Sequence, residues 1–162
     1  MTAVPHTLAD PAATPPTPAT MVDRYLQLCE DRDLDEAGKL LAPAARLVFP
    51  GGAAYGSLPD MVAGQRGRYQ WVRKRRDRYF DGSTPDGLVT VTSLGTLYGQ
   101  DRDGEPFEGI RYADVFVLRD GLIAEQHIYN DLAETGISAP AGGRPRPRPT
   151  EVETTEEQRY RT

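Results

Sequence analysis

The sequence predicts an α+β domain in which helices pack against an antiparallel sheet. Two β-rich runs, residues 110–118 and 122–130, are separated by Arg119-Asp120-Gly121, and Asp-Gly between such runs indicates a hairpin. Capping signals followed by apolar stripes indicate helices in the first half of the chain. A chain of 162 residues is large enough for one core and one small-ligand cavity. We therefore expect a single domain of this class.

The predicted domain covers residues 20–137 and lies between two segments of biased composition. Residues 1–19 contain five prolines among alanine and threonine. Residues 138–162 alternate arginine with proline and then turn acidic. Because neither composition buries enough apolar surface to offset the entropy lost on ordering, both segments are predicted to be disordered.

Two helices and a short strand are predicted in the first fifty residues. A capping box that starts at Thr20 precedes an apolar stripe and predicts a helix over residues 21–32. Asp33 is the expected N-cap of a shorter helix over residues 34–42. The β-rich run at residues 45–50 ends in a proline and is expected to form a short strand.

A long helix and a meander of strands are predicted in the rest of the domain. Ser57 begins another capping signature, and the helix that it opens is expected to run to about Phe80. Residues 88–98 and 105–118 are expected to form strands, which together with the hairpin give a three-strand meander. A last capping box starts at Asp131.

The predicted hairpin has two faces that are both partly apolar, because side chains alternate across a strand. One face of its first strand carries Ile110, Tyr112, Asp114 and Phe116. The opposite face of the hairpin carries Arg111, Ala113, Val115, Val117, Ile123, His127 and Tyr129. This second face would expose too much apolar surface in a monomer, so a homodimer through it is expected.

Composition excludes several classes of function. The net charge of −5 and the pI near 5.1 argue against general nucleic-acid binding, and the basic run at residues 73–78 is expected to be a solvated helix face. Cys29 is the single cysteine, which excludes an internal disulfide and fits a reducing cytoplasm. With only His6 and His127 as histidines, no metal and no cofactor is expected. No run reaches the length of a membrane span, so the protein is expected to be soluble and cytoplasmic.

The order of the predicted elements resembles the nuclear transport factor 2-like superfamily, specifically its SnoaL-like branch. The resemblance covers residues 20–137 and rests on the opening stretch RYLQLCEDRDLDEA and the closing stretch DGLIAEQHIYNDL. It implies a cone-shaped, curved antiparallel sheet wrapped by three helices around one deep pocket, often in a dimer packed through the outer sheet face. Such proteins include isomerases, cyclases, dehydratases, epoxide hydrolases and pure binding modules, so the fold alone does not settle function.

Compared residue by residue, the opening helix is similar to that of ketosteroid isomerase. The resemblance puts Tyr25 and Asp114 at that family's two oxyanion-hole positions. In that enzyme an apolar site keeps the aspartic acid neutral so that it donates a hydrogen bond, and a desolvated Asp114 is expected to do the same. Phe49 stands where the isomerase has its general-base aspartate. Ile128 stands where the SnoaL cyclases and limonene-epoxide hydrolase have a carboxylate, and His127 is expected to point away from the pocket.

The predicted pocket binds a small, largely apolar molecule that bears a carbonyl or a phenol. Tyr25 and Asp114 are its expected polar anchors, and the rest of its lining is expected from Phe49, Tyr55, Tyr69, Tyr112, Phe116, Gln126, Ile128 and Asn130. One hypothesis is a cofactor-free cyclase, isomerase or dehydratase of small-molecule metabolism, for example of polyketides, terpenoids or steroid-like molecules. The other is a non-catalytic ligand-binding or dimerisation module. The missing carboxylates at positions 49 and 128 favour the module, and a desolvated Asp114 favours the enzyme.

Overall fold

The structure is a computed structural model that describes residues 14–137. Its helices are α1 (Pro18–Glu30), α2 (Leu34–Gly38) and α3 (Leu58–Gly64). Each begins at a residue whose side chain accepts a hydrogen bond from the backbone N–H three positions further on; these caps are Thr17, Asp33 and Ser57. None of the helices in this part of the chain combines the length and apolar character needed to cross a membrane. The disorder predicted for residues 1–13 and 138–162 lies outside the described residues.

Six strands form one sheet in the order β2-β1-β6-β5-β4-β3. Their bounds are β1 (Leu41–Val48), β2 (Ala54–Tyr55), β3 (Tyr69–Ser83), β4 (Val89–Asp101), β5 (Pro106–Arg119) and β6 (Leu122–Asn130). All neighbours pair antiparallel except β1 and β6, which run parallel. The predicted hairpin is β5–β6, and its turn places Asp120 and Gly121 in the left-handed region at φ 52° and 77°. The α+β class predicted from the sequence is confirmed.

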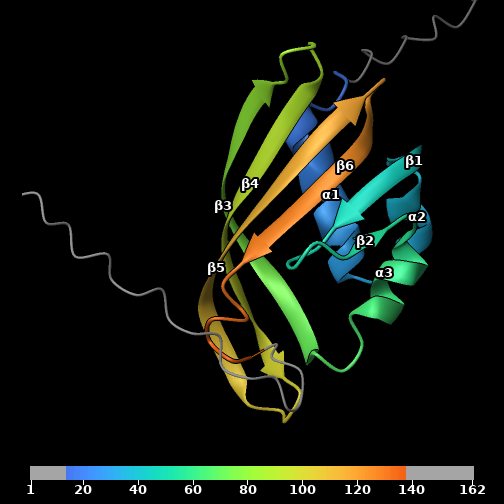
Figure 1. The fold of residues 1–162 in the computed structure, drawn as a ribbon. Helices are drawn as coiled ribbons and strands as arrows, with labels where there is room; N and C mark the ends of the chain where they lie inside the picture. The colour runs from blue at the N-terminus through green and yellow to red at the C-terminus, as the bar shows by residue number, and fades with distance from the viewer. Residues whose placement is uncertain (1–13, 138–162) are drawn as a thin grey trace, which may run out of the picture.

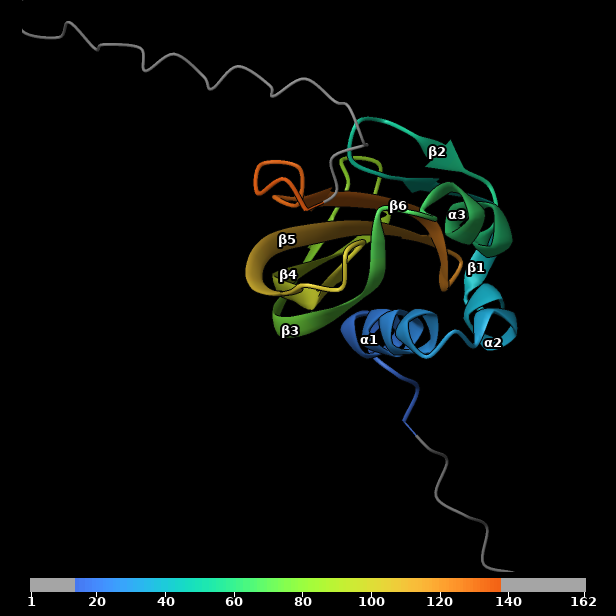
Figure 2. The same ribbon diagram turned by 90° about the horizontal axis from the view of Figure 1, so that it is seen from below.

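The long strands curve, and the helices lie together on one side of the sheet (Figures 1 and 2). In Figure 2, α1 runs along the concave side of the sheet, next to β3, while α2 and α3 lie beside β1. The main core fills the space between α1 and the strands and contains Val22, Tyr25, Leu26, Ala37, Leu47, Leu58, Val91, Phe116, Leu118 and Ile123. A smaller cluster at the other end of the sheet contains Leu97, Tyr112 and Leu132. The interior between these clusters is where a cavity remains.

The predicted long helix from Ser57 to about Phe80 is wrong, because its second half is the edge strand β3. Helix α3 ends at Gly64, and Gly67 leaves the helical region with φ 79°. The basic run at residues 73–78 therefore lies on a strand and is not one solvated helix face. Along β3 the less exposed side chains are Tyr69, Val72, Lys74, Arg76 and Tyr79.

Two irregularities in the pairing of β3 with β4 explain the error. The register shifts between Tyr69 and Trp71 and again between Arg76 and Arg78. A bulge adds one residue to the strand, so the inward side chains are separated by three residues at each shift and by two elsewhere. A mixture of two- and three-residue steps resembles the spacing of an amphipathic helix in the sequence.

Several smaller expectations also need correction. Helix α1 begins at Pro18 with Thr17 as its cap, ahead of the predicted start of the domain at residue 20. Helix α2 ends at Gly38, because residue 41 already begins β1. The capping box at Asp131 opens only a series of turns in the described residues. Ile123 was expected on the outer face but is fully buried in the core, since a register shift between Val117 and Leu118 changes its side of the sheet.

Both bulges of β3 lie against glycines of β4. A Cβ added to Gly95 would lie 1.9 Å from the carbonyl oxygen of Arg75, and one added to Gly99 would lie 2.2 Å from that of Trp71. Real Cβ atoms do not approach backbone oxygens so closely, so these positions need glycine. The two glycines thus allow β3 to bend around the interior.

Gly95→Ala is expected to destabilise the fold, because the methyl group must push the backbone of β3 outward at its bulge. Overpacking of this kind costs about 1–3 kcal/mol or more, which urea denaturation followed by circular dichroism measures. Gly38→Ala is the control, since a Cβ there meets nothing within 4 Å. Equal midpoints for the two variants would contradict the close approach of β3 and β4.

Candidate functional site

A cavity of about 650 Å³ lies between α1, the inner face of the sheet and the N-terminal part of β3. Its apolar lining includes Leu26, Phe49, Met61, Val72, Leu97, Ile128 and Leu132. Its polar and charged lining includes Tyr25, Cys29, Glu30, Arg32, Tyr69, Lys74, Tyr112, Asp114, Gln126 and Asn130. A space of this size and mixed character is typical of a small-molecule site.

The structure brings most of the residues expected in the pocket to this cavity. Its wall contains Tyr25, Phe49, Tyr69, Tyr112, Asp114, Gln126, Ile128 and Asn130. Phe116 is instead buried in the core, where its ring meets that of Tyr25 edge to face. Tyr55 packs against Phe49, and its hydroxyl accepts a hydrogen bond from Gln65. Phe116 and Tyr55 support cavity residues from behind and do not line the cavity.

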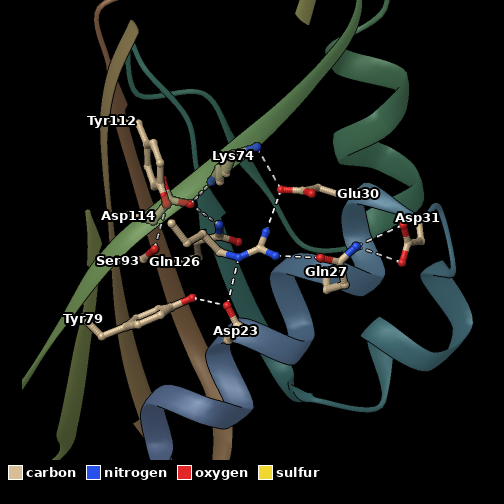
Figure 3. A network of polar contacts seen from close by, with 11 residues as sticks. Asp23, Gln27, Glu30, Asp31, Lys74, Tyr79, Ser93, Tyr112, Asp114 and Gln126 are labelled. Atoms are coloured by element: carbon tan, nitrogen blue, oxygen red, sulfur yellow. Dashed lines mark hydrogen bonds and ion pairs between the residues drawn. The ribbon is translucent and has the colours of Figure 1, made fainter. Parts of the chain in front are cut away.

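Asp114 is the centre of the polar groups in the cavity wall, and its side chain has an exposed fraction of 0%. Its Oδ2 atom receives both available donors: the Lys74 ammonium forms an ion pair with it, and Gln126 Nε2 donates to it at 3.1 Å. Its Oδ1 atom has no hydrogen-bond partner among residues 14–137. The carboxyl group therefore has one fully engaged oxygen and one buried oxygen without a donor (Figure 3).

Tyr25 reaches Asp114 only through Gln126. The Tyr25 hydroxyl donates to Gln126 Oε1 at 2.9 Å, and the amide of Gln126 in turn donates to Asp114. Burial is the largest cause that raises the pKa of Tyr25 well above its ordinary value, so the phenol stays neutral. Tyr25 and Asp114 are thus linked by hydrogen bonds through the side-chain amide of Gln126. The resemblance had instead implied that both donate to one ligand oxygen.

Lys74 was not recognised from the sequence, because it was assigned to a solvated helix face. Its side chain is only 16% exposed, and its ammonium lies 4.7 Å from the centroid of the Tyr112 ring. The resemblance implied a neutral Asp114 that donates a hydrogen bond, whereas the structure places a cation, the Lys74 ammonium, directly on its carboxyl group. A period-two reading of the run from Val72 to Arg76 would have found Lys74 on the inner face.

Tyr112 lies on the same strand as Asp114, two residues before it, and lines the same cavity. Its hydroxyl is within hydrogen-bonding distance of Ser93 Oγ, at 2.9 Å. Burial raises the pKa of Tyr112 to about 12, so this hydroxyl also remains neutral at physiological pH. The wall around Asp114 consequently contains one carboxylate, one ammonium and two neutral phenols.

A second network fixes the position of Lys74 from the side of α1 (Figure 3). Glu30 Oε1 accepts from the backbone N–H of Lys74 at 3.0 Å and from Arg76 Nη1 at 2.8 Å. Arg76 also donates to Asp23 Oδ1 at 2.9 Å and to Gln27 Oε1 at 2.6 Å. Because β3 is an edge strand with two bulges, these contacts hold the segment that carries Lys74 against the helix.

Cys29 faces the cavity from the last turn of α1 and gives a test of its environment. Burial raises the pKa of its thiol from its ordinary value of 9.0 to about 11. The folded state therefore keeps the proton that the unfolded chain loses, so this contribution to stability is present below pH 9 and is lost as pH rises to about 11.

Alkylation of Cys29 by iodoacetamide at mildly alkaline pH is expected to be about 100-fold slower in the folded protein than in the urea-unfolded chain, since only the thiolate reacts. Mass spectrometry of timed samples measures both rates in one protein. Similar rates would show that the thiol is freely ionised and that α1 does not close this side of the cavity.

Within residues 14–137, no group of three or more histidine, cysteine, aspartate or glutamate side chains is arranged to hold a metal ion. His127 lies on the opposite face of β6, where its Nε2 atom is 2.7 Å from Glu125 Oε2. The described groups that face the cavity are thus suited to hydrogen bonding and proton transfer.

Comparisons with known proteins identify the fold. No family model matches the sequence, and no curated protein matches it. Among solved structures, an NTF2-like protein of unknown function from Burkholderia pseudomallei has a TM-score of 0.64 at 17% identity, covering 75% of this chain and 97% of the other. TerC, co-crystallised with polyporic acid, has a TM-score of 0.61 at 16% identity, covering 72% and 94%.

A candidate polyketide cyclase from Xanthomonas campestris has a TM-score of 0.56 at 14% identity, and the match covers 75% of this chain and 96% of that one. These proteins share the architecture of this chain over nearly their whole length, at identities that show the fold alone. The six-stranded curved sheet with three helices on one side agrees with them. The protein therefore has the nuclear transport factor 2-like fold that its sequence resembles.

Proposed function

We propose that this protein is a cofactor-free acid–base enzyme, of cyclase, isomerase or dehydratase type, that acts on a small, largely apolar molecule with an enol or phenol hydroxyl. The observation that carries this proposal is the buried Oδ1 atom of Asp114, which receives no hydrogen bond from the described part of the chain. An unsatisfied buried acceptor costs about 1–3 kcal/mol, or more for a charged group. A ligand hydroxyl or acidic C–H group would supply the missing donor.

The proposed chemical step is a proton transfer to Asp114. The carboxylate takes the proton from the ligand O–H or C–H group, and the electron pair of that bond stays on the ligand as an enolate or phenolate. The Lys74 ammonium, which pairs with Asp114 Oδ2, then stabilises the new anion. Since Asp114 has no exposed surface, a neighbouring side chain must shift to admit the ligand to Oδ1, while the Lys74 ammonium stays on Oδ2.

The comparisons support the chemical class of the ligand. Candidate polyketide cyclases share the fold, and TerC was crystallised with polyporic acid. The orange carotenoid protein of Anabaena, whose structure holds canthaxanthin, matches at a TM-score of 0.53 over 67% of this chain. Polyporic acid and canthaxanthin are small molecules with extensive apolar surface, which suits the apolar part of the cavity.

One observation favours the alternative of a non-catalytic binding module. The described residues supply two carboxylates to the cavity wall, Asp114 and Glu30, and Glu30 is engaged by Arg76 and the backbone of Lys74. The enzymes that the sequence resembles have carboxylates at the positions of Phe49 and Ile128. In this protein both side chains are apolar parts of the cavity wall. The protein would then hold its ligand on Asp114 without a second group to complete a reaction.

Hydrogen–deuterium exchange distinguishes the two functions. 2-Tetralone, a small apolar ketone with an enolisable C–H group, is incubated with the protein in heavy water and its exchange is followed by NMR. An enzyme with Asp114 as base is expected to accelerate exchange, and Asp114→Asn is expected to abolish the acceleration. Binding of 2-tetralone without exchange above the buffer rate would support the binding module and reject the enzyme.

We further propose that the protein is a homodimer through the outer face of the sheet. This face carries Ala113, Val115 and Val117 and the exposed ring of Tyr129, which is 60% exposed, and the described helices lie on the other side of the sheet (Figure 2). Val115→Lys is expected to give a monomer in light scattering, because burying an unpaired ammonium at the interface is costly. Val89→Lys, at an exposed strand end, is the control. A wild-type monomer at high micromolar concentration would reject this interface.

A further inference from the structure

A cation in the wall of the cavity is not used by the network around Asp114. Arg32 follows α1 and belongs to the residues that line the cavity. Of the other cavity charges, Lys74 pairs with Asp114 and Glu30 pairs with Arg76 of β3, while the exposed Arg73 is a second lining cation without an ion pair among the described residues. Among the described residues, Arg32 has no ion pair or side-chain hydrogen bond.

The acidic neighbours of Arg32 are occupied elsewhere. Both carboxylate oxygens of Asp31 accept from Gln27 Nε2 at 3.1 Å. Asp33 Oδ1 accepts from the backbone N–H of Glu36 at 3.3 Å, as the cap of α2. Two acids flank the arginine in the sequence, yet neither forms an ion pair with it among the described residues. Its guanidinium, with five donors in a planar fork, remains available to a ligand.

The backbone of Arg32 is strained, which singles out this position. It has φ 63°, in the left-handed region that residues other than glycine rarely adopt. The chain turns here between α1 and α2, and glycine would adopt the same conformation without strain. An arginine in this place costs stability, and its side chain forms no hydrogen bond or ion pair within the described part of the protein.

The electrostatic influence of Arg32 extends to two cavity side chains. Burial is the main cause that raises the pKa of both Tyr69 and Cys29, and the charge of Arg32 acts in the opposite direction on each of them. Tyr69 lies at the start of β3, and Cys29 lies on the last turn of α1. The guanidinium thus acts on both sides of the cavity.

From this placement we infer that Arg32 is an anion anchor and that the ligand is a hydroxylated apolar acid. Its hydroxyl or enol group binds Asp114, and its carboxylate binds the guanidinium of Arg32. This inference rests on the proposed function for the hydroxyl end and on Arg32 alone for the acidic end. The opposite ends of such a ligand would meet opposite charges, which fixes its orientation in the cavity.

The test compares 6-hydroxy-2-naphthoic acid with its methyl ester, which lacks the negative charge. Calorimetry at neutral pH is expected to show that Arg32→Gln weakens binding of the acid by up to about fivefold, the range for an ion pair formed by a solvent-exposed side chain such as Arg32. The ester is expected to bind both proteins alike. Added salt should weaken only the acid. Arg24→Gln removes the same charge from an exposed position on α1 outside the cavity and is the matched control.

Arg32→Gly separates the anchor from a structural role. Relief of the strained backbone is expected to raise the melting temperature, while binding of the acid falls as in Arg32→Gln. Equal effects of the Arg24 and Arg32 substitutions, or equal losses for acid and ester, would overturn the inference. If 2-naphthol fails to bind while the acid still depends on Arg32, the proposed role of Asp114 is wrong and the anion anchor remains.

Discussion

Lys74→Met is expected to lower the free energy of unfolding by about 3–5 kcal/mol, the usual range for breaking a buried ion pair from one side. The reason is that Asp114 has no exposed surface and its Oδ2 atom would keep only the Gln126 donor. The carboxyl group must then either stay charged without a cation or take up a proton. Chemical denaturation followed by fluorescence or circular dichroism measures the loss.

The double variant Lys74→Met with Asp114→Leu is expected to recover most of that stability, because it removes both charges and replaces them with apolar groups. Lys39→Met is the control for a surface pair: Lys39 and Glu36 are both exposed, and this change should leave stability nearly unaltered. A single Lys74 variant as stable as the wild type would show that the pair is solvated and that Asp114 is not held as a buried carboxylate.

Asp114→Asn is expected to reverse the ligand preference of the cavity. The two donors on Oδ2, from Lys74 and Gln126, will orient the oxygen of the new amide toward themselves, which leaves its NH₂ group in the place of Oδ1. 2-Naphthol, which donates a hydrogen bond, then loses about 1.5–3 kcal/mol of binding free energy. 2-Acetylnaphthalene, which only accepts one, is expected to gain affinity. Calorimetry measures both.

The matched probe for this experiment is 2-methoxynaphthalene, which keeps the ring system and removes the donor. Wild-type protein is expected to prefer 2-naphthol to this ether. If both compounds bind the wild type equally, or if Asp114→Asn weakens all three compounds alike, the orientation of Asp114 has no role in recognition and the cavity selects by shape only.

The sequence predicted the sheet better than the helices, for a physical reason. Strands β4 and β5 alternate regularly around Asp114 and end in glycine-containing turns, so their existence and the position of Asp114 on the inner face followed from period two, whereas a register shift at the start of β6 concealed the burial of Ile123. Strand β3 contains two bulges, and the space for them is provided by Gly95 and Gly99 on another strand. Such a long-range cause leaves no mark in the local pattern of β3.

The same error concealed the partner of Asp114. Lys74 was placed on a solvated helix, and the polar anchors were taken from the resemblance as Tyr25 and Asp114 acting together. The structure interposes Gln126 between these two side chains and adds an ammonium from β3. Which oxygen of Asp114 is engaged depends on residues up to 40 positions away in the chain, and a sequence pattern carries no such information.

A crystal structure of the complex with 2-naphthol tests the assignment of Asp114 most directly. The hydroxyl oxygen is expected about 2.5–2.7 Å from Asp114 Oδ1, as for an O–H group that donates to a carboxylate, with Lys74 still beside the carboxyl group and the rings against the apolar lining. A complex in which the hydroxyl points away from Asp114, while Oδ1 stays buried without a donor, would contradict the role of this oxygen in ligand recognition.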